Sequence, residues 1–194
     1  LYLGAYDDVI LRLDRTTGAA IDQHQLPKRD NGEVRRVIDL QTTADQVWDR
    51  HIADSAQLST LAPSAQNWID LGAGAGLPAL IIAALRQHTN PRFQMTVVES
   101  DQRKCAFMAE ASRNMNTPIQ ILNTRIEKAN VTGFDTVSAR ALAPLTKLLA
   151  YAEPFRGDGA TCLFPKGVLV DQELTAAAKH WHMTFDRYPS ATDD

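Results

Sequence analysis

The glycine-rich segment at residues 70–76 is the sequence feature that most constrains how this chain can fold. It reads Asp70-Leu-Gly-Ala-Gly-Ala-Gly76, closes an apolar run at 67–72 and leads into a second apolar run at 78–87. The first run is typical of a short buried strand, and the second of a buried helix with Pro78 in its first turn. Glycines at such a junction let the backbone approach a ligand, and a helix N-terminus offers unpaired N–H groups. The segment therefore predicts an α/β fold with a ligand site at this turn.

Beyond this segment, patterns typical of strands and helices alternate along the chain. Further strands are expected at 94–99, 118–124, 134–139, 160–164 and 182–188, and helices at 101–116, from Pro144 to the turn at 157–159, and at 171–180. Ser100 or Asp101 is expected to cap the first of these helices. Alternation of this kind predicts a mostly parallel sheet with helices on both faces.

Residues 1–60 lack this alternation. The segment 17–33 is polar, contains two glycines and a proline, and is expected to be a loop, whereas 44–61 is expected to be helical. A length of 194 residues suits one globular domain with a short addition. We therefore expect a small N-terminal cap at 1–60, partly loop and partly helical, and a ligand-binding domain at 61–194.

Acidic residues stand on both sides of the glycine segment. Glu99 ends the second expected strand, 23 residues after Gly76, where a carboxylate can accept hydrogen bonds from the two hydroxyls of a ribose. Asp70 precedes the turn, and its charge suits the ammonium group of an amino acid. Residues 74–79 also fit the dinucleotide pattern G-x-G-x-x-G/A, so a nicotinamide cofactor is the alternative. The acid before the turn favours S-adenosylmethionine, which carries a ribose, a sulfonium and an ammonium group.

Charge and composition narrow the classes of partner. The chain carries 20 Lys and Arg against 23 Asp and Glu, but residues 100–166 hold nine basic and six acidic side chains. On charge alone a solvated surface is the simpler explanation, and a phosphate-binding face is allowed. The longest apolar run, 77–85, is about half of the ~18 residues that a membrane span needs, and no signal peptide is expected. The distant Cys105 and Cys162 predict no metal site and fit a reducing cytoplasm.

Several linked motifs, taken in order, resemble the RsmG/GidB family of bacterial 16S ribosomal RNA guanine-N7 methyltransferases. These motifs are residues 47–55, 70–78, 98–107, 124–127, 138–145 and 166–167. The similarity covers about residues 37–192, whereas residues 1–36 do not resemble the usual opening of the family and Ala79 stands where its members usually carry glycine. The chain stops before the final strand that the family leads us to expect, so we expect the domain at 61–194 to lack it.

The resemblance implies a Rossmann-like class I methyltransferase fold, with S-adenosylmethionine as cofactor and 16S ribosomal RNA, or a small-subunit assembly particle, as partner. It also implies roles for individual residues. The cofactor-binding residues expected from the turn and the resemblance together are Asp70, Gly72, Gly74, Gly76, Leu77, Glu99, Ile126, Glu127 and Arg140. Arg140 follows the fourth strand, where it would contact the cofactor or the incoming base. On the substrate side, His51 would lie near the mouth of the pocket, and Lys166 could meet an RNA phosphate.

The chemistry implied by the resemblance needs no acid or base. Guanine N7 carries a lone pair and no proton, so methyl transfer requires orientation and the exclusion of water, and we assign no catalytic residue. Residues 138–141 read Ser-Ala-Arg-Ala and lack the Asp/Asn-Pro-Pro-aromatic element of amino-group methyltransferases. A nicotinamide-dependent oxidoreductase and a non-catalytic RNA-binding module stay open as alternatives. We expect a cytoplasmic protein without membrane contact, and a monomer.

Overall fold

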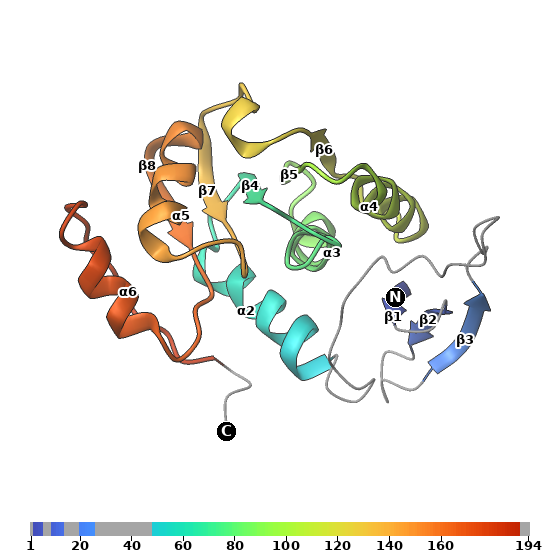
Figure 1. The fold of residues 1–194 in the computed structure, drawn as a ribbon. Coiled ribbons are helices and arrows are strands. Elements are labelled where there is room, and N and C mark those ends of the chain that lie inside the picture. Colours follow the sequence, from blue (N-terminus) through green and yellow to red (C-terminus); the bar gives the residue numbers. More distant parts are fainter. Residues whose placement is uncertain (1, 6–8, 14–19, 26–47, 191–194) are drawn as a thin grey trace.

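The centre of the molecule is a five-stranded sheet in which every paired neighbour is parallel. The computed structural model describes residues 2–5, 9–13, 20–25 and 48–190 (Figure 1). The strands are β4 (Asn67–Leu71), β5 (Gln94–Glu99), β6 (Gln120–Asn123), β7 (Phe134–Ser138) and β8 (Arg156–Leu163), in the order β6-β5-β4-β7-β8. The expected α/β fold with a parallel sheet is confirmed. Because the chain winds outward from β4 in both directions, the carboxyl ends of β4, β5 and β7 form the crevice where ligands of such sheets bind.

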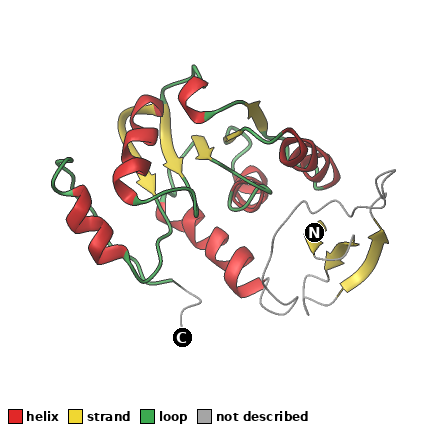
Figure 2. Ribbon diagram, viewed as in Figure 1, coloured by secondary structure: helices red, strands yellow, loops and turns green. Residues whose placement is uncertain are grey.

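Helices cover both faces of this sheet, as predicted (Figure 2). On one face α2 (Asp54–Leu61), α3 (Ala79–Thr89) and α4 (Gln102–Asn114) pack over the side chains of Trp68 and Met95. On the other face α5 (Leu145–Ala152) packs over Ile69 and Val98. Successive strand residues thus point to opposite faces, which is why the strands read as nearly continuous apolar runs.

The ends of the helices follow the expected capping chemistry. Asp101 caps α4, and its carboxylate accepts hydrogen bonds from the backbone N–H groups of Arg103 at 2.8 Å and Lys104 at 3.4 Å. Pro144 immediately precedes α5, whose end leads through a 3₁₀ turn (Glu153–Phe155) into β8. The last helix, α6 (Val170–Ala177), starts close to the expected residue 171. None of the helices in the described ranges is long and apolar enough to cross a membrane.

The first 60 residues contain a second, smaller sheet. Strands β1 (Tyr2–Ala5), β2 (Val9–Leu13) and β3 (Ala20–Gln25) pair antiparallel in the order β1-β2-β3. The prediction of a loop at 17–33 is therefore wrong for residues 20–25. It was based on the polar composition of this segment, whereas pairing with strand β2 makes these residues a strand. The rest of 17–33, like residues 44–47 of the expected helix, lies outside the described residues.

The first helical element in the described part of the chain is the π-helix η1 (Trp48–Ala53), which runs directly into α2. The helical prediction for 44–61 is thus confirmed from residue 48 onward. Leu58 of α2 packs into the same core as Trp68 of β4. The division of the chain between residues 60 and 61 stays a prediction.

Two predictions near the C-terminus are wrong. Residues 182–188 form no strand, and Arg187 within them bonds to Asp171 of α6. The two residues that follow this segment contact α2: Gln57 Nε2 donates to Pro189 O at 2.7 Å and Ser190 Oγ donates to Asp54 Oδ1 at 2.8 Å. Most residues of 182–188 are exposed, and the segment does not pair with a neighbouring strand, so its alternating sequence pattern does not lead to a strand. The glycines at 157–159, predicted to form a turn, lie inside β8, which shifts register against β7 between Phe134 and Thr136.

Candidate functional site

The glycine turn, residues 72–76, lies where predicted, between β4 and α3 at the carboxyl edge of the sheet. The Gly72 N–H donates to Val98 O at 2.8 Å, which ties the turn to the neighbouring strand β5. Gly72 and Gly76 have φ values of +64° and +91°, a region that favours glycine. A Cβ at Gly72 would lie 2.6 Å from Leu142 Cδ1, and one at Gly76 would lie 2.5 Å from Leu80 Cδ1. Both positions therefore favour glycine for conformation, and a Cβ there would also require the side chain of Leu142 or Leu80 to shift.

Glu99 joins the turn to the start of the next helix. Its side chain is buried, and the residue is 9% exposed. Oε2 accepts the N–H of Gly74 at 2.9 Å, and Oε1 accepts the N–H of Asp101 at 2.8 Å. Because a carboxylate offers about four lone-pair positions, each oxygen keeps capacity for one more donor. Glu99 can thus hold the turn and still accept two hydroxyl groups from a ligand.

Asp70 is the most deeply buried acid among the described residues, at 1% exposure. Ser138 Oγ donates to its Oδ1 at 2.5 Å, and Trp68 Nε1 donates to Ser138 Oγ at 2.9 Å. The indole N–H can only donate, so the single proton of the serine hydroxyl is directed to Asp70. The other oxygen, Oδ2, is buried and has no hydrogen-bond partner in the described part of the chain. Sequence reasoning identified Asp70 but missed Ser138, because the two residues are 68 positions apart.

This environment changes the acidity of Asp70. Burial raises the pKa of Asp70 to about 7, while the hydrogen bond from Ser138 and the charge of Arg140 oppose the rise. The carboxyl group is therefore close to half protonated at neutral pH. A cation placed at Oδ2 would favour the ionised form, so Asp70 is suited to an ammonium group.

Arg140, predicted to be a ligand contact, lies just beyond the end of β7 and reaches His51 of η1. Its Nη2 lies 2.8 Å from His51 Nδ1. Burial lowers the pKa of Arg140, and the negative charges of Asp54 and Asp70 oppose this change, so the guanidinium remains a cation. The structure thus brings together two predicted residues that lie 89 positions apart, on elements that meet at the carboxyl edge of the sheet. The π-helical turn at His51 fits this position, since such turns are frequent at functional sites.

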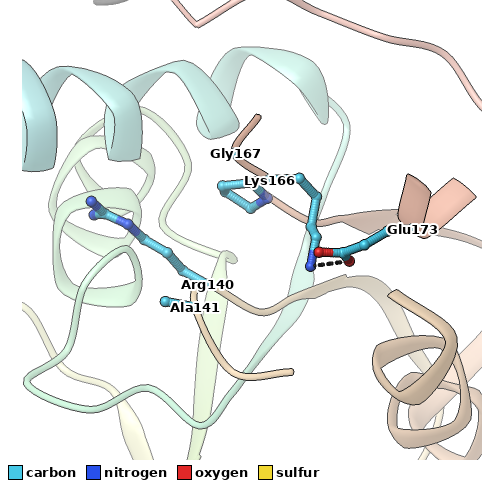
Figure 3. A pocket seen from close by; sticks show the side chains of 6 residues that line it. Arg140, Ala141, Lys166, Gly167 and Glu173 are labelled. Carbon is cyan, nitrogen blue, oxygen red and sulfur yellow. Dashed lines mark ion pairs between the residues drawn. The ribbon is translucent and has the colours of Figure 1, made fainter. Parts of the chain in front are cut away.

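Lys166, predicted to meet an RNA phosphate, lies instead in an ion pair within the chain. Its Nζ is 2.6 Å from Glu173 Oε2 (Figure 3). Lys166 Nζ also donates to Ala143 O at 3.1 Å. The backbone N–H of Leu145 also donates to Glu173 Oε2, at 2.7 Å. Sequence reasoning missed Glu173, because nothing local distinguishes it from its helix neighbour Asp171. These contacts leave the role of Lys166 toward RNA a prediction.

A solvent-open pocket of about 300 Å³ lies beside this ion pair. We name it the edge pocket; its lining residues are Arg140, Ala141, Pro165, Lys166, Gly167 and Glu173. Figure 3 shows the Lys166–Glu173 pair on one side, while the side chain of Arg140 extends in the opposite direction. The edge pocket contains neither the glycine turn nor Glu99, so it is a separate hollow beside the ends of β7 and β8.

Two further predicted residues follow β6. Ile126 and Glu127 belong to the 3₁₀ turn η2 (Ile126–Lys128), and β6 pairs with β5 so that Asn123 lies opposite Glu99. Ile126 is half-buried against the core, whereas Glu127 is exposed and accepts the hydroxyl of Tyr151 at 2.9 Å. Both residues thus contact the part of the molecule that α5 covers. Leu77, in the loop that leads into α3, is half-buried.

Comparisons with known proteins show the family to which this chain is related. The family described as GidB, rRNA small subunit methyltransferase G, matches residues 32–190. The protein named ribosomal RNA small subunit methyltransferase G from Dinoroseobacter shibae is 46% identical over 154 residues, which cover 79% of this chain and 79% of that protein. The protein of the same name from Methylorubrum extorquens is 44% identical over 183 residues, covering 93% and 86%.

One solved structure shows the same fold at low sequence similarity. It is the crystal structure of a protein from Pyrococcus horikoshii named as a transferase candidate, with a TM-score of 0.55 and 14% identity. The match covers 81% of this chain and 52% of that one. The Rossmann-like arrangement of the described sheet and helices is therefore shared with a chain of largely different sequence.

Proposed function

Because this chain belongs to the rRNA small subunit methyltransferase G (GidB) family, we propose that it transfers a methyl group from S-adenosylmethionine to N7 of a guanine in 16S ribosomal RNA. The observation that carries the proposal is the pair of buried carboxylates at neighbouring strand ends, Asp70 and Glu99, on either side of the glycine turn. The family supports the RNA substrate, and the two carboxylates support the cofactor.

The residues of the turn fit S-adenosylmethionine. The unpartnered, buried Oδ2 of Asp70 would accept the ammonium group, and Glu99 would accept the ribose hydroxyls. Gly72, Gly74, Gly76 and Leu77 would line the pocket, and Ile126, Glu127 and Arg140 would contact the remaining parts of the cofactor. A dinucleotide fits less well, because its pyrophosphate would lie near the carboxyl group of Asp70. The proposed cofactor-binding residues are thus the same residues that the sequence analysis predicted.

The proposed chemistry depends on placement. Bound S-adenosylmethionine supplies an electrophilic methyl carbon, and guanine N7 has a lone pair and no proton to lose. The chain therefore has to hold the base in line and exclude water, which in favourable cases contributes about 7–11 kcal/mol. Arg140, whose guanidinium contacts His51, is the residue that we propose contacts the bound cofactor or the incoming base. No residue is assigned the role of general acid or base.

On the substrate side, the proposed partner is 16S ribosomal RNA or a small-subunit assembly particle. The basic segment 100–166 carries nine Lys and Arg against six Asp and Glu, which supports binding to phosphates. His51 and Lys166 are the proposed substrate-side residues. We further propose that the protein acts in the cytoplasm as a monomer, with residues 1–60 as a cap on the domain at 61–194.

A methyl-transfer assay tests the proposal. The protein is incubated with methyl-labelled S-adenosylmethionine and either deproteinised 16S ribosomal RNA or small-subunit particles, and the RNA is then digested to nucleosides. We expect the label in 7-methylguanosine at one mapped position. Label in any other nucleoside, or none in either substrate, would contradict the proposal.

A further inference from the structure

The edge pocket adjoins the proposed cofactor site at a defined point of the sheet. Strands β4 and β7 are neighbours, with Asp70 directly opposite Ser138, and Arg140 follows two residues later. In S-adenosylmethionine only three carbon atoms join the ammonium group, proposed to bind Asp70, to the sulfonium. The ribose, proposed to bind Glu99 on β5, extends toward the other side of β4. In this orientation the reactive methyl group would lie on the β7 side of β4, which is the side on which the edge pocket opens.

Glu173 gives this pocket a fixed hydrogen-bond acceptor. Its Oε2 takes both the Lys166 ammonium at 2.6 Å and the Leu145 N–H at 2.7 Å, and no described residue donates to Oε1. Burial raises the pKa of Glu173, but the hydrogen bonds from Lys166 and Leu145 and the charge of Lys166 outweigh it, so that the pKa lies below its usual value. The side chain is 23% exposed, so it is accessible from the pocket and remains ionised at neutral pH.

We propose that the edge pocket receives the guanine to be methylated and that Glu173 selects this base by accepting hydrogen bonds from its N1–H and N2–H₂ groups. This inference rests on the proposed function and names the residue that gives it base specificity. Guanine alone among the four RNA bases presents two adjacent donors on its Watson–Crick edge, and single-stranded RNA bases are commonly recognised on that edge. Adenine would place its N1 lone pair against the carboxylate.

The orientation also suits the reaction. With its N1 and N2 edge on Glu173, guanine directs its N7 and O6 edge away from α6. N7 can then face the methyl donor, while the ammonium of Lys166 offsets the charge of the Glu173 carboxylate. Glu173 also connects α6 to the first residue of α5, so a purely structural role is the competing explanation. A structural role and base selection predict different responses to a change in the base.

The test compares two RNA substrates that differ by one amino group. Synthetic RNA containing the mapped target carries either guanosine or inosine, which lacks the N2 amine and keeps N7. For the wild-type protein we expect kcat/KM to fall about 10-fold or more with inosine, because a hydrogen bond to a charged acceptor is lost. Equal rates on the two wild-type reactions would overturn the inference without any variant.

Glu173→Gln then assigns the preference to this residue. The amide keeps the size of the side chain and one acceptor, so we expect guanosine RNA to react at about the inosine rate, with the ratio near one. Affinity for S-adenosylhomocysteine should stay close to wild type, and the melting temperature should fall by no more than the ~2–4 °C expected for loss of the ion pair with Lys166. Asp171→Asn, on the exposed face of the same helix, is the matched control and should keep the wild-type ratio.

A Glu173→Gln protein that keeps the full preference for guanosine would overturn the inference, as would parallel losses on both RNAs with the ratio unchanged. Failure of the proposed function is distinguishable, because the wild-type protein would then label neither RNA at N7. That result would remove the premise and overturn both claims together.

Discussion

Two regions on one edge of the sheet differ in how they prepare for a ligand. At the ends of β4 and β5, the glycine turn is flanked by Asp70 and Glu99, which are almost fully buried, and one oxygen of Asp70 has no partner in the described chain. At the ends of β7 and β8, the edge pocket is open, and its acid, Glu173, is already neutralised by Lys166. The first region keeps a buried, unpartnered acceptor for a cation, whereas in the second the charge of the acid is paired and its Oε1 is the acceptor proposed for a neutral, planar base.

This difference between the two regions predicts how strongly each can contribute to the free energy of ligand binding. An unpartnered buried carboxyl group costs free energy in the absence of a ligand, and a cation that binds there removes this cost. An ion pair that is already formed gains little from a further charge but can still discriminate between hydrogen-bond donors. We therefore expect substitutions in the first region to change cofactor affinity strongly, and substitutions in the second to change substrate choice or stability modestly.

The largest expected effect is at Glu99. Glu99→Ala removes the acceptor proposed for two ribose hydroxyls and the contacts to the N–H groups of Gly74 and Asp101. Two hydrogen bonds to a charged group are worth about 4 kcal/mol or more together, so affinity for S-adenosylhomocysteine should fall about 1,000-fold. Calorimetric titration measures this loss, and Glu110→Ala, an exposed glutamate on α4, is the control. RNA affinity should change far less; equal losses for both ligands would show that Glu99 is misplaced.

The next largest effect is expected on the pH dependence of the free energy of unfolding. Asp70 has a pKa of about 7 in the folded chain and 3.8 as a free side chain, so the folded protein holds a proton that the unfolded chain releases. This contribution to stability is complete below about pH 4 and is lost as pH rises through about 7, by at most about 4 kcal/mol. Asp70→Asn keeps the shape and cannot titrate. Denaturant unfolding of both proteins from pH 4.5 to 8 should show the wild-type stability falling relative to the variant, and parallel curves would contradict the assigned burial.

A smaller, ligand-specific effect is expected at Ser138. Ser138→Ala removes the hydroxyl that donates to Asp70 Oδ1, which raises the pKa of Asp70 further and disfavours the ionised form. At pH 7.5 the affinity for S-adenosylhomocysteine should fall about 10-fold. The affinity for 5′-methylthioadenosine, which lacks the ammonium group, should be unchanged. Ser112→Ala, at a buried serine that donates to Thr117 O, controls for lost stability; equal losses for the two ligands would assign Ser138 a structural role only.

The smallest effect is expected in the second region. Lys166→Met removes the partner of Glu173 while keeping the apolar stem, and this partly exposed ion pair should contribute about 1 kcal/mol, or 2–4 °C in melting temperature. Cofactor affinity should be unchanged. Arg187→Ala, which breaks an exposed pair with Asp171, should shift the melting temperature less. A large loss of cofactor affinity in Lys166→Met would remove the distinction between the two regions.

The first region was predictable from sequence because its parts are close along the chain. Asp70 and the three glycines follow one another, and Glu99 ends the next strand, so strand pairing alone brings them together. In the second region Arg140 and Lys166 were predicted, but Glu173 was not, because its role depends on contacts with Lys166 and with Leu145 on another helix. Ser138 was missed for the same reason, since its partner Asp70 lies on a neighbouring strand.

The errors in the fold have a related cause. The strand predicted at 182–188 was inferred from its own alternation, but side chains of α2 and α6 hold the segment that includes it. The loop predicted at 17–33 was inferred from polarity, but residues 20–25 pair with β2. In both cases the local sequence described the segment itself but did not show which other parts of the chain it contacts. The parallel sheet was predictable because its strands are buried on both faces and therefore read as apolar runs.

The most direct test of the central claim is a crystal structure of the protein with S-adenosylhomocysteine. We predict that its ammonium group lies within hydrogen-bond distance of Asp70 Oδ2 and that its ribose hydroxyls lie on Glu99, with the sulfur directed toward the edge pocket. A ligand bound elsewhere, or bound at the glycine turn with its amino-acid end away from Asp70, would contradict the assignment of these two carboxylates.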